Sequence, residues 1–178
     1  VTASADTMSQ YRNHHFAHPK KWICADIECD AGCGIVPFEY QDKNFVNSLQ
    51  WAIGLELFLL IKDPWRIYLT TDHPNGAAFT AYPKIIKLLM DRSFRNNEFA
   101  KINKHAQKSS ILSDLKREYN LYDIAILTRA GPAKVLGLKN TGHLGVGANA
   151  NITVYSEIED KEKMFENPYM VIKDGEIV

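Results

Sequence analysis

The stretch IYLTTDHPNG, residues 67–76, opens with apolar residues and closes with an acid, an imidazole, a proline, an amide and a glycine. An apolar run over 66–71 that is bounded by turn residues predicts a buried parallel strand. Asp72 follows that strand directly, and His73 and Asn75 come soon after it. The residues at this break are therefore the first candidates for a functional site.

Asp72 can be interpreted in two ways from the residues alone. At the carboxyl end of a strand in a β/α barrel it would face the active site, where a carboxylate binds a divalent metal and accepts the proton of a metal-bound water. Just before a helix it would instead be an N-cap, a position that favours Asp and Asn alike. Physical chemistry leaves both interpretations open.

The segments on either side of this stretch predict helices. Apolar residues recur at helical spacing over 44–61, and Pro64 ends that helix because a residue before proline avoids the α conformation. A second helix is predicted over 82–90, with Pro83 in its first turn. Further helices are expected at 110–119, 122–128 and 132–137, the last of them ended by Gly137. Helix, strand and helix in this order are typical of a β/α repeat.

The two ends of the chain differ from this middle part. Residues 22–28 and 35–40 predict a hairpin that follows a polar, loop-like start. Beyond 139 the chain is rich in glycine, 151–156 alternates like a strand, and Asp174-Gly175 between apolar runs predicts a second hairpin. We therefore expect three segments, the last of them all-β: 1–41, 42–138 and 139–178.

The composition excludes several classes of protein. The 178 residues carry 21 basic and 21 acidic side chains, so there is no electrostatic basis for a nucleic-acid or membrane partner. The most apolar stretch, 45–61, has polar interruptions and falls short of the roughly 18 apolar residues of a membrane helix. Cys24, Cys29 and Cys33 form an odd set, which argues against a disulfide framework and favours a reducing cytoplasm.

Other patterns favour ordinary roles over chemical ones. GVGANA, 145–150, has the glycine spacing of a dinucleotide fingerprint, but it follows a helix and leads into a strand instead of the reverse. The cysteine spacing lacks the close pair of zinc and iron–sulfur sites, and His14, His15 and His18 have no helical pattern around them. Glu56 on the long helix is interpreted as solvent-facing or salt-bridged.

Several motifs together resemble one known family. TTDHPNGAAFTAYPKIIKLLMD, TRAGPAKVLGL and GHLGVGANANITVY carry the resemblance, and CDAGCGIVPF and NSLQWAIGLELFLLIKDPWR extend it over nearly the whole chain. They look like the C-terminal part of the amidohydrolase-type subunit of the formylmethanofuran dehydrogenases, within the metal-dependent amidohydrolase superfamily. The resemblance implies an α/β fold: 42–138 as the last βα part of a TIM-like (β/α)8 barrel, 139–178 as a flanking β-sandwich segment, and 1–41 as a loop and hairpin insert.

The resemblance also implies a chemistry. The family is expected to hold a binuclear zinc centre and to interconvert formate plus methanofuran and formylmethanofuran, in carbon dioxide fixation or methanogenesis in the archaeal cytoplasm. Formate would come from a tungsten- or molybdenum-pterin site on partner subunits. Asp72 matches the family's last-strand aspartate, which binds metal and handles the proton of the bridging water. His73 and Asn75 match only the surroundings of the substrate.

The chain also departs from the superfamily pattern. The first-strand His-x-His, the bridging carboxylated lysine and the later histidine ligands are absent, and Asn149 and Asn151 stand where the family has acids that look structural. Because each zinc needs roughly four ligands, Asp72 alone cannot hold a pair. We expect the 178-residue chain by itself to bind no stable zinc pair and to be inactive, as a fragment or a split subunit that other segments complete.

Two other functions stay open at this point. One is a different zinc amidohydrolase that acts on a cyclic amide, and the apolar QWAIGLELFLLIKDPWR and the CDAGCGIVPF stretch argue against it. The other is a non-catalytic structural or interaction fragment, which the absent metal ligands favour for the chain taken alone. Upstream sequence with His-x-His and the lysine would separate these functions.

Overall fold

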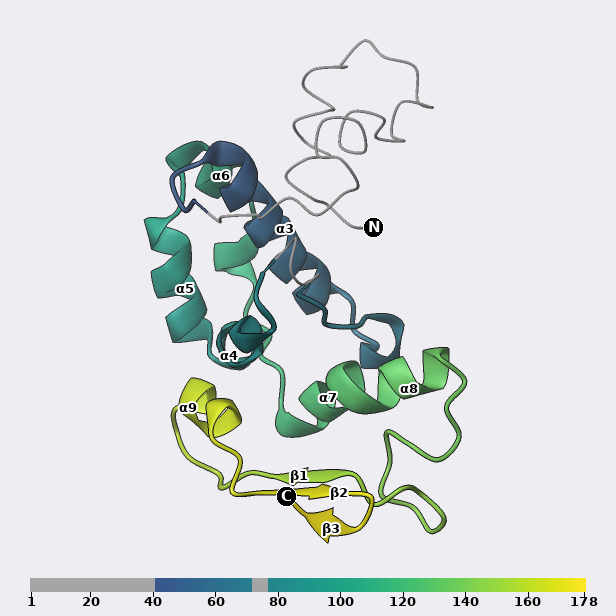
Figure 1. The fold of residues 1–178 in the computed structure, drawn as a ribbon. Helices are drawn as coiled ribbons and strands as arrows, with labels where there is room; N and C mark the ends of the chain where they lie inside the picture. Colours follow the sequence, from purple (N-terminus) through teal and green to yellow (C-terminus); the bar gives the residue numbers. More distant parts are fainter. Residues whose placement is uncertain (1–40, 72–76) are drawn as a thin grey trace, which may run out of the picture. The chain divides into compact units, whose positions relative to one another are not determined.

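The computed structural model describes residues 41–71 and 77–178, and Figure 1 shows their course as a ribbon. The helices are α3 (Phe45–Leu60), α4 (Tyr82–Met90), α5 (Arg92–Lys101), α6 (Lys104–Lys108), α7 (Leu121–Ala125), α8 (Gly131–Val135) and α9 (Lys161–Glu166). Single turns of 3-10 helix lie at Pro64–Arg66, Phe79–Ala81 and Leu112–Asp114, and a π-turn lies at Ile126–Ala130. The strands are β1 (Ile152–Val154), β2 (Met170–Lys173) and β3 (Glu176–Ile177). The hairpin predicted within 22–40, the three cysteines and the three early histidines lie outside the described residues.

The chain divides into two compact units. Unit 1 comprises Val1–Leu57, Thr71–Phe79 and Asn96–Leu115, and unit 2 comprises Phe58–Thr70, Thr80–Arg95 and Lys116–Val178. Each unit is described separately below. The segment boundaries predicted from the sequence, near 41 and 138, stay a prediction.

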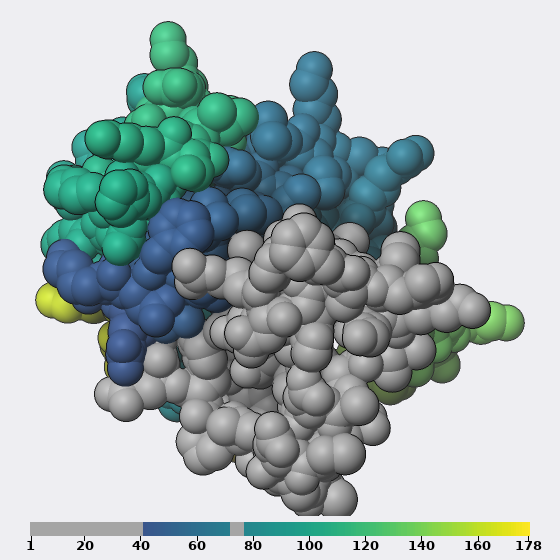
Figure 2. Space-filling model, turned by 90° about the horizontal axis from the view of Figure 1, so that it is seen from above, coloured from purple at the N-terminus to yellow at the C-terminus, as the bar shows by residue number. Residues whose placement is uncertain are grey.

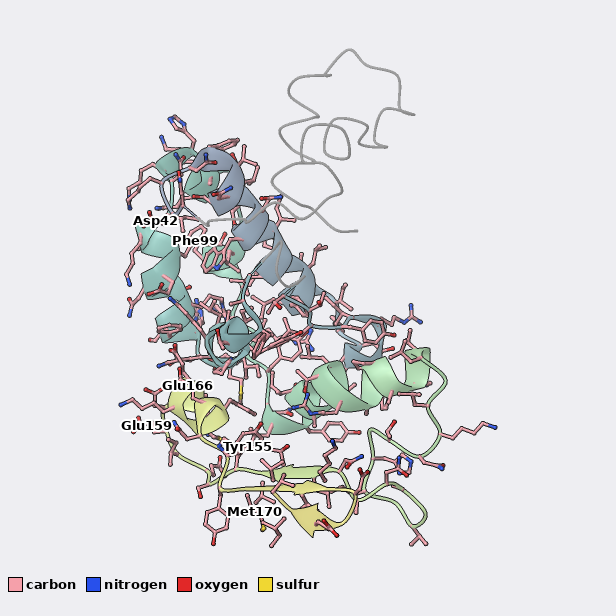
Figure 3. The ribbon with its side chains drawn as sticks, viewed as in Figure 1. Asp42, Phe99, Tyr155, Glu159, Glu166 and Met170 are labelled. Carbon is pink, nitrogen blue, oxygen red and sulfur yellow. The ribbon has the colours of Figure 1, made fainter. Side chains whose placement is uncertain are left out.

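In unit 1 the helix predicted over 44–61 is confirmed as α3. It begins where the Asn44 side-chain oxygen accepts a hydrogen bond from the Val46 N–H at 2.9 Å, the usual N-cap arrangement. The core consists of buried apolar side chains from α3 and from 96–115: Val46, Ala52, Leu55, Phe99, Ile102, Ala106 and Leu112. Phe99 is labelled in Figure 3. These contacts join two segments that are far apart in the sequence.

Polar contacts hold the same two segments of unit 1 together. The Ser48 hydroxyl donates to the Asp42 carbonyl at 2.7 Å and accepts from the Asn103 N–H at 3.1 Å. The Glu56 carboxylate accepts from the Ser110 hydroxyl and from the Ile111 N–H, the latter at 2.8 Å. Figure 2 shows the surface of the α3 residues adjoining that of the residues near 100–115. Glu56 is therefore a half-buried hydrogen-bond acceptor inside this unit, and no basic side chain among the described residues forms an ion pair with it.

The helix predicted over 110–119 is wrong. Only Leu112–Asp114 forms a single 3-10 turn, and the chain is extended at the next residue, Leu115. Helical spacing of apolar residues predicted the wrong structure for 110–119, because tertiary contacts prevail over helix propensity there. The Glu56 carboxylate binds the start of the segment, and a backbone bond to α4 binds its end. At that end, the Tyr119 N–H donates to the Leu89 carbonyl at 3.0 Å.

Unit 2 contains a network of side-chain donors near α4, which forms at Tyr82–Met90 as predicted. The Arg117 guanidinium donates to the carbonyls of Leu59, Ile61 and Lys62, where α3 ends. The Tyr119 hydroxyl donates to the Phe58 carbonyl. These bonds satisfy carbonyl groups that the end of a helix leaves without intrahelical partners.

Arg95 is fully buried in the same network. Its guanidinium donates to the carbonyls of Leu88 at 2.9 Å and Arg117 at 3.1 Å. Burial lowers the pKa of Arg95 and raises the pKa of the Tyr119 phenol, because desolvation disfavours the charged form of each group. Both side chains bind backbone carbonyls, so these shifts reflect packing.

A helical run from 121 to 135 joins α7, the π-turn and α8. It begins with a capping box, in which the Asn120 side chain accepts from the Asp123 N–H and the Asp123 side chain accepts from the Asn120 N–H. The helices predicted at 122–128 and 132–137 are thus confirmed as parts of one run. Gly137 has a φ of 69°, as expected of a residue that ends a helix.

The tail forms a small antiparallel sheet with the order β1-β2-β3. The predicted hairpin is confirmed: Asp174 and Gly175 have φ of 53° and 89°, which matches a type I′ turn. The Asn151 side chain accepts from the Asp174 N–H at 2.7 Å, so the structural role inferred for position 151 is confirmed. The expectation of an all-β tail is wrong, because α9 lies between β1 and β2. The Tyr155 ring, labelled in Figure 3, packs against Phe165 of α9 at 5.0 Å between centroids.

The strand predicted over 66–71 does not form among the described residues. Ile67 has extended backbone angles, but residues 67–71 belong to no strand. A strand needs a neighbour that accepts and donates along its length. Among the described strands of the chain every pairing is antiparallel and lies within 152–177. No helix in the described ranges is long and apolar enough to cross a membrane.

Candidate functional site

The three residues that the sequence singles out, Asp72, His73 and Asn75, lie outside the described residues. Their predicted roles therefore stay predictions. The structure does describe the chain on both sides of them. The Ala77 N–H donates to the Thr71 carbonyl at 2.8 Å, so the residues that flank 72–76 are bonded to each other.

The approach to this segment is held by local and distant contacts in unit 2. The Asp63 carboxylate caps the turn Pro64–Arg66 by accepting from the Trp65 N–H at 3.1 Å. The Leu69 side chain is buried, and its N–H donates to the Leu127 carbonyl at 3.4 Å. The backbone at Leu69 is thus bonded to the helical run 121–135, and among the described residues it belongs to no sheet. Sequence reasoning missed this contact, and no sequence signal marks a backbone carbonyl in a π-turn.

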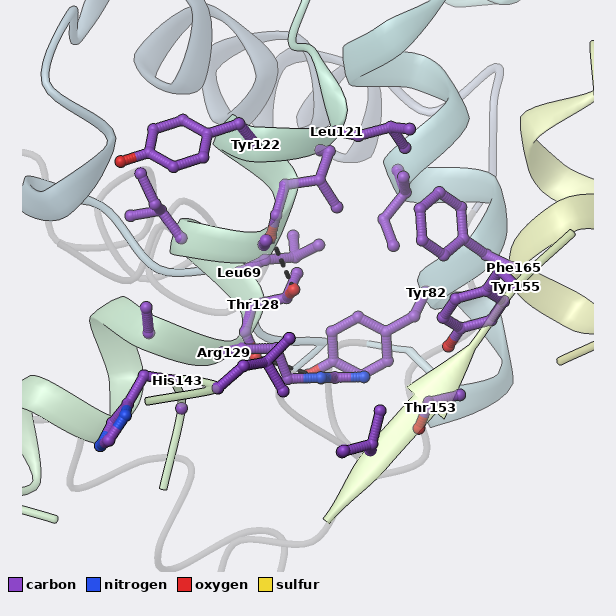
Figure 4. Close-up of a pocket in the computed structure, with 18 of the residues that line it drawn as sticks. Leu69, Tyr82, Leu121, Tyr122, Thr128, Arg129, His143, Thr153, Tyr155 and Phe165 are labelled. Atoms are coloured by element: carbon purple, nitrogen blue, oxygen red, sulfur yellow. Dashed lines mark hydrogen bonds between the residues drawn. The ribbon is translucent and has the colours of Figure 1, made fainter. Parts of the chain in front are cut away.

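Unit 2 also contains a cavity of about 850 Å³. Its walls come from α4, the helical run 121–135, the glycine-rich loop, β1 and α9, as Figure 4 shows. Aromatic and aliphatic side chains dominate the lining, among them Leu69, Tyr82, Tyr155 and Phe165. A cavity of this size and character suits an apolar or aromatic group.

The polar groups of this cavity are mostly occupied by bonds within the chain. The Thr128 hydroxyl donates to the Ile124 carbonyl at 2.7 Å, and Arg129 donates to the Thr128 carbonyl at 3.1 Å. In His143, Nδ1 accepts from the Gly145 N–H at 3.1 Å, and Nε2 lies 2.9 Å from the Lys139 carbonyl. The tautomer with its proton on Nε2 satisfies both bonds, so His143 organises its own loop.

One ion pair with shifted pKa values lies in unit 2 apart from the cavity lining. The Lys87 ammonium is 2.7 Å from the Asp160 carboxylate, 3.8 Å from Glu162 and 4.6 Å from the centre of the Phe94 ring. The hydrogen bond between Lys87 and Asp160 raises the pKa of the lysine and lowers the pKa of the aspartate. Because Asp160 also caps α9, this pair joins α9 to α4 and has a structural explanation.

The described side chains do not make a metal centre. Among residues 41–71 and 77–178, no group of three or more His, Cys, Asp or Glu side chains is arranged to hold a metal ion. Zinc sites need about four nitrogen, sulfur or oxygen ligands. The described residues alone therefore do not fit the binuclear zinc centre that the resemblance implies, and zinc stays a prediction.

The chain belongs to the Amidohydrolase family, whose model matches residues 1–178. It thus has an amidohydrolase fold of mixed helix and strand.

Two relatives show which members of the family it is similar to. It is 47% identical over 176 residues to the FhcA subunit of the formyltransferase/hydrolase complex of Methylorubrum extorquens, covering 99% of this chain and 32% of the relative. It is 45% identical over 186 residues to protein FwdA of Methanocaldococcus jannaschii, covering 100% of this chain and 32% of the relative.

A solved structure is similar over the same range. This is the crystal structure of the formyltransferase/hydrolase complex (FhcABCD) from Methylorubrum extorquens in complex with methylofuran. The TM-score is 0.79 at 47% identity, with 98% of this chain and 32% of the other covered. The chain therefore spans about a third of the length of the relatives that it matches, and the resemblance inferred from the motifs is confirmed. One relative is bacterial, so the motifs do not by themselves indicate that this chain comes from an archaeon.

Proposed function

We propose that this chain is part of an amidohydrolase subunit that interconverts formate plus methanofuran and formylmethanofuran, in carbon dioxide fixation or methanogenesis. One observation carries the proposal: a TM-score of 0.79 at 47% identity to a chain from a complex solved with methylofuran. Since the likeness covers 98% of this chain but 32% of the other, the activity belongs to a longer assembly.

The finer fold follows from the same proposal. Residues 42–138 would be the last βα part of a TIM-like barrel, and residues 139–178 would be part of a flanking β-sandwich. The helices on both sides of 67–71 and the antiparallel sheet of the tail are compatible with this arrangement. In the full barrel, neighbouring strands would supply the ladder that 67–71 lacks among the described residues.

The proposal includes partners and cofactors. The relative's complex is named with four subunits, which supports a role for this chain beside other subunits. A binuclear zinc centre would need ligands beyond Asp72, and we propose that they come from residues outside this chain. The tungsten- or molybdenum-pterin on partner subunits rests on the sequence resemblance alone.

Asp72 has two roles in this proposal, as a metal ligand and as a proton acceptor. A bound divalent metal would lower the pKa of a coordinated water and polarise the amide carbonyl. The Asp72 carboxylate would accept the proton that the attacking water loses, and would return it to the leaving amine. Capping alone would need none of this chemistry, because Asn caps as well as Asp.

Asp72→Asn separates these roles in the intact subunit within its complex. The amide keeps the capping ability but loses the charge and the proton-accepting oxygen pair. We expect the hydrolysis of formylmethanofuran to fall by roughly 100- to 10,000-fold, with metal content lowered by elemental analysis. Asp114→Asn, at an exposed aspartate, is the matched control and should keep wild-type activity.

The outcome that contradicts the proposal is an Asp72→Asn loss smaller than about tenfold. The cyclic amidohydrolase would be favoured instead if the wild type hydrolysed a cyclic amide but not formylmethanofuran, and if Asp72→Asn lost the activity on the cyclic amide. Release of formate and of the free amine should be measured together, so that hydrolysis is distinguished from substrate loss.

A further inference from the structure

The outer edge of β1 has no neighbouring strand among the described residues, because the order of the sheet is β1-β2-β3. In an antiparallel sheet the backbone groups of successive residues face opposite edges. The Val171 carbonyl of β2 accepts from the Val178 N–H, on the β3 side. Thr153 lies opposite Val171, so the N–H and C=O of Thr153 face away from β2. The outer edge of β1 therefore offers a donor and an acceptor to a further strand.

The two edges of this sheet differ. β3 is two residues long, is exposed and carries Glu176, and short length and charge are features that discourage pairing at an edge. The edge of β1 lies instead beside the cavity of unit 2, whose lining includes Ile152, Thr153 and Tyr155. Figure 4 shows Thr153 and Tyr155 on this strand at the cavity. A strand beside β1 would thus have both backbone partners and an apolar cavity within reach.

Several large apolar side chains of the cavity lining are exposed. Tyr122 is 70% exposed, and Leu144 is 81% exposed. Exposed apolar side chains that gather at an apolar cavity mark an interaction site. The polar groups of Thr128 and His143 bond within the chain, and no Asp or Glu belongs to the lining that the described residues form. The cavity therefore favours apolar side chains over a polar small molecule.

An extended polypeptide segment would satisfy the edge and the cavity together. Its backbone would bond to the outer edge of β1, and every second side chain would point to the same face. The solved relative indicates where such a segment comes from. The likeness covers 98% of this chain but 32% of the relative's chain, so most of that polypeptide lies outside the similar part.

We propose that the outer edge of β1 and the adjoining cavity receive an extended apolar segment from the remainder of the same subunit polypeptide. The segment adds a strand to the described sheet on the β1 side, and its alternate side chains pack against Tyr122, Leu144 and Tyr155. This inference rests on the part of the proposed function that makes this chain a portion of a longer subunit. It requires no catalytic residue to be in place.

The first test is a photo-crosslink in the intact subunit within its complex. Tyr122 is replaced by p-benzoylphenylalanine, and mass spectrometry identifies the peptide that becomes joined to it. We expect a peptide of the same polypeptide from outside residues 1–178, with apolar residues at alternate positions. Tyr169 is the matched control, because it is 73% exposed and does not belong to the cavity lining. The same replacement at Tyr169 should not capture that peptide.

Three results of the crosslink would overturn the proposal. The first is capture of a peptide from another subunit of the complex or from within residues 1–178. The second is a crosslinked dimer of the subunit, recognised by its doubled mass. The third is a yield of the expected peptide at Tyr122 no higher than at Tyr169.

A second test examines the backbone bonds at the edge of β1. Thr153→Pro removes the N–H that faces away from β2, a place where an edge strand tolerates proline. Amide exchange of the captured segment should become about tenfold faster, which corresponds to the loss of roughly one hydrogen bond. Thr153→Val keeps the N–H and is the control. Equal exchange of the segment in the two variants would refute the pairing. If Thr153→Pro does not fold, the crosslink at Tyr122 decides alone.

Crosslinking and exchange are measured without an assay of the reaction, so failure of this proposal is distinguishable from failure of the proposed function. If Tyr122 captures the expected peptide while Asp72→Asn is fully active, the added strand is supported and the proposed activity is refuted. If Tyr122 captures no such peptide while Asp72→Asn is inactive, the added strand is refuted and the proposed activity stands.

Discussion

Two stretches of unit 2, 67–70 and Met170–Lys173, have similar apolar composition, and both are predicted to be strands. The second is β2, paired on both sides by β1 and β3. The first forms no ladder among the described residues, and its Leu69 N–H donates to the Leu127 carbonyl. β2 is joined to β3 by a turn of two residues, whereas the partner of 67–70 in the described chain lies almost sixty residues away.

The difference shows that a similar apolar composition does not by itself predict strand pairing. In β2 the Asp174-Gly175 turn brings the neighbour within reach, so the local sequence specifies the ladder. In 67–70 only Leu69 is buried, and its N–H bonds to a carbonyl that a π-turn of the helical run presents.

The largest expected effect comes from removing the buried side chain of Leu127, the residue whose carbonyl accepts from the Leu69 N–H. Leu127 is fully buried, and truncating a buried leucine costs about 2–5 kcal/mol. Leu127→Ala in the intact subunit should speed amide exchange at 66–70 strongly and leave 170–177 unchanged. Val135→Ala, at an exposed position of the same run, is the control. Unchanged exchange at 66–70 would mean that this stretch is stable without the helix.

A smaller effect is expected for the second stretch, the hairpin of β2 and β3. Gly175 has a φ of 89°, where a Cβ costs roughly 1–2 kcal/mol. Gly175→Ala should therefore speed exchange at 170–177 and not at 66–70. Asp174→Gly is the control, since it suits the same turn and keeps the N–H that bonds to Asn151. Equal exchange in Gly175→Ala and wild type would show that the turn does not specify the hairpin.

The smallest effect concerns Asp160, which acts both locally and at a distance. Its carboxylate caps α9 through the Glu162 N–H at 3.1 Å and pairs with Lys87 of α4 at 2.7 Å. The lowered pKa of Asp160 means that its contribution is present above the pKa of the unfolded chain and is lost as the pH falls through the folded value. The raised pKa of Lys87 means that its contribution is present below the unfolded pKa and is lost as the pH rises through the folded value.

Lys87→Met therefore lowers the Tm of the intact subunit slightly near neutral pH, because a partly exposed pair contributes little. The Tm difference from wild type should shrink as the pH falls below the usual range of a carboxyl group. Lys116→Met, at an exposed lysine, should show no such trend. A Tm difference that stays constant down to the lowest pH would contradict a role for the Asp160 charge.

Much of the fold was predictable because its signals are short-range. Asn44 before an apolar helical pattern, Pro83 in a first turn and Gly137 past a last turn each act within about four residues. The same kind of signal marks α9, where Asp160 caps the helix. That helix was missed because the tail was interpreted from its strands alone.

The candidate site was predictable only in part. The motif around Asp72 suggested a strand end and a family, and the family is confirmed. The role of Asp72 stays a prediction. No local pattern shows that a Cβ at Gly131 would meet the ring of Tyr68, sixty-three residues earlier in the chain.

The sequence by itself determined the helix ends, the hairpin turn and the family, because caps, turns and motifs depend on residues that are close together in the sequence. Only the tertiary structure decided that Leu69 bonds to a helical run, that 110–119 is not helical, and that Glu56 binds Ser110. Each of these depends on partners more than fifty residues apart, whose meeting follows from the packing of the whole unit. Propensity is a fraction of a kcal/mol per residue, so such contacts prevail over it.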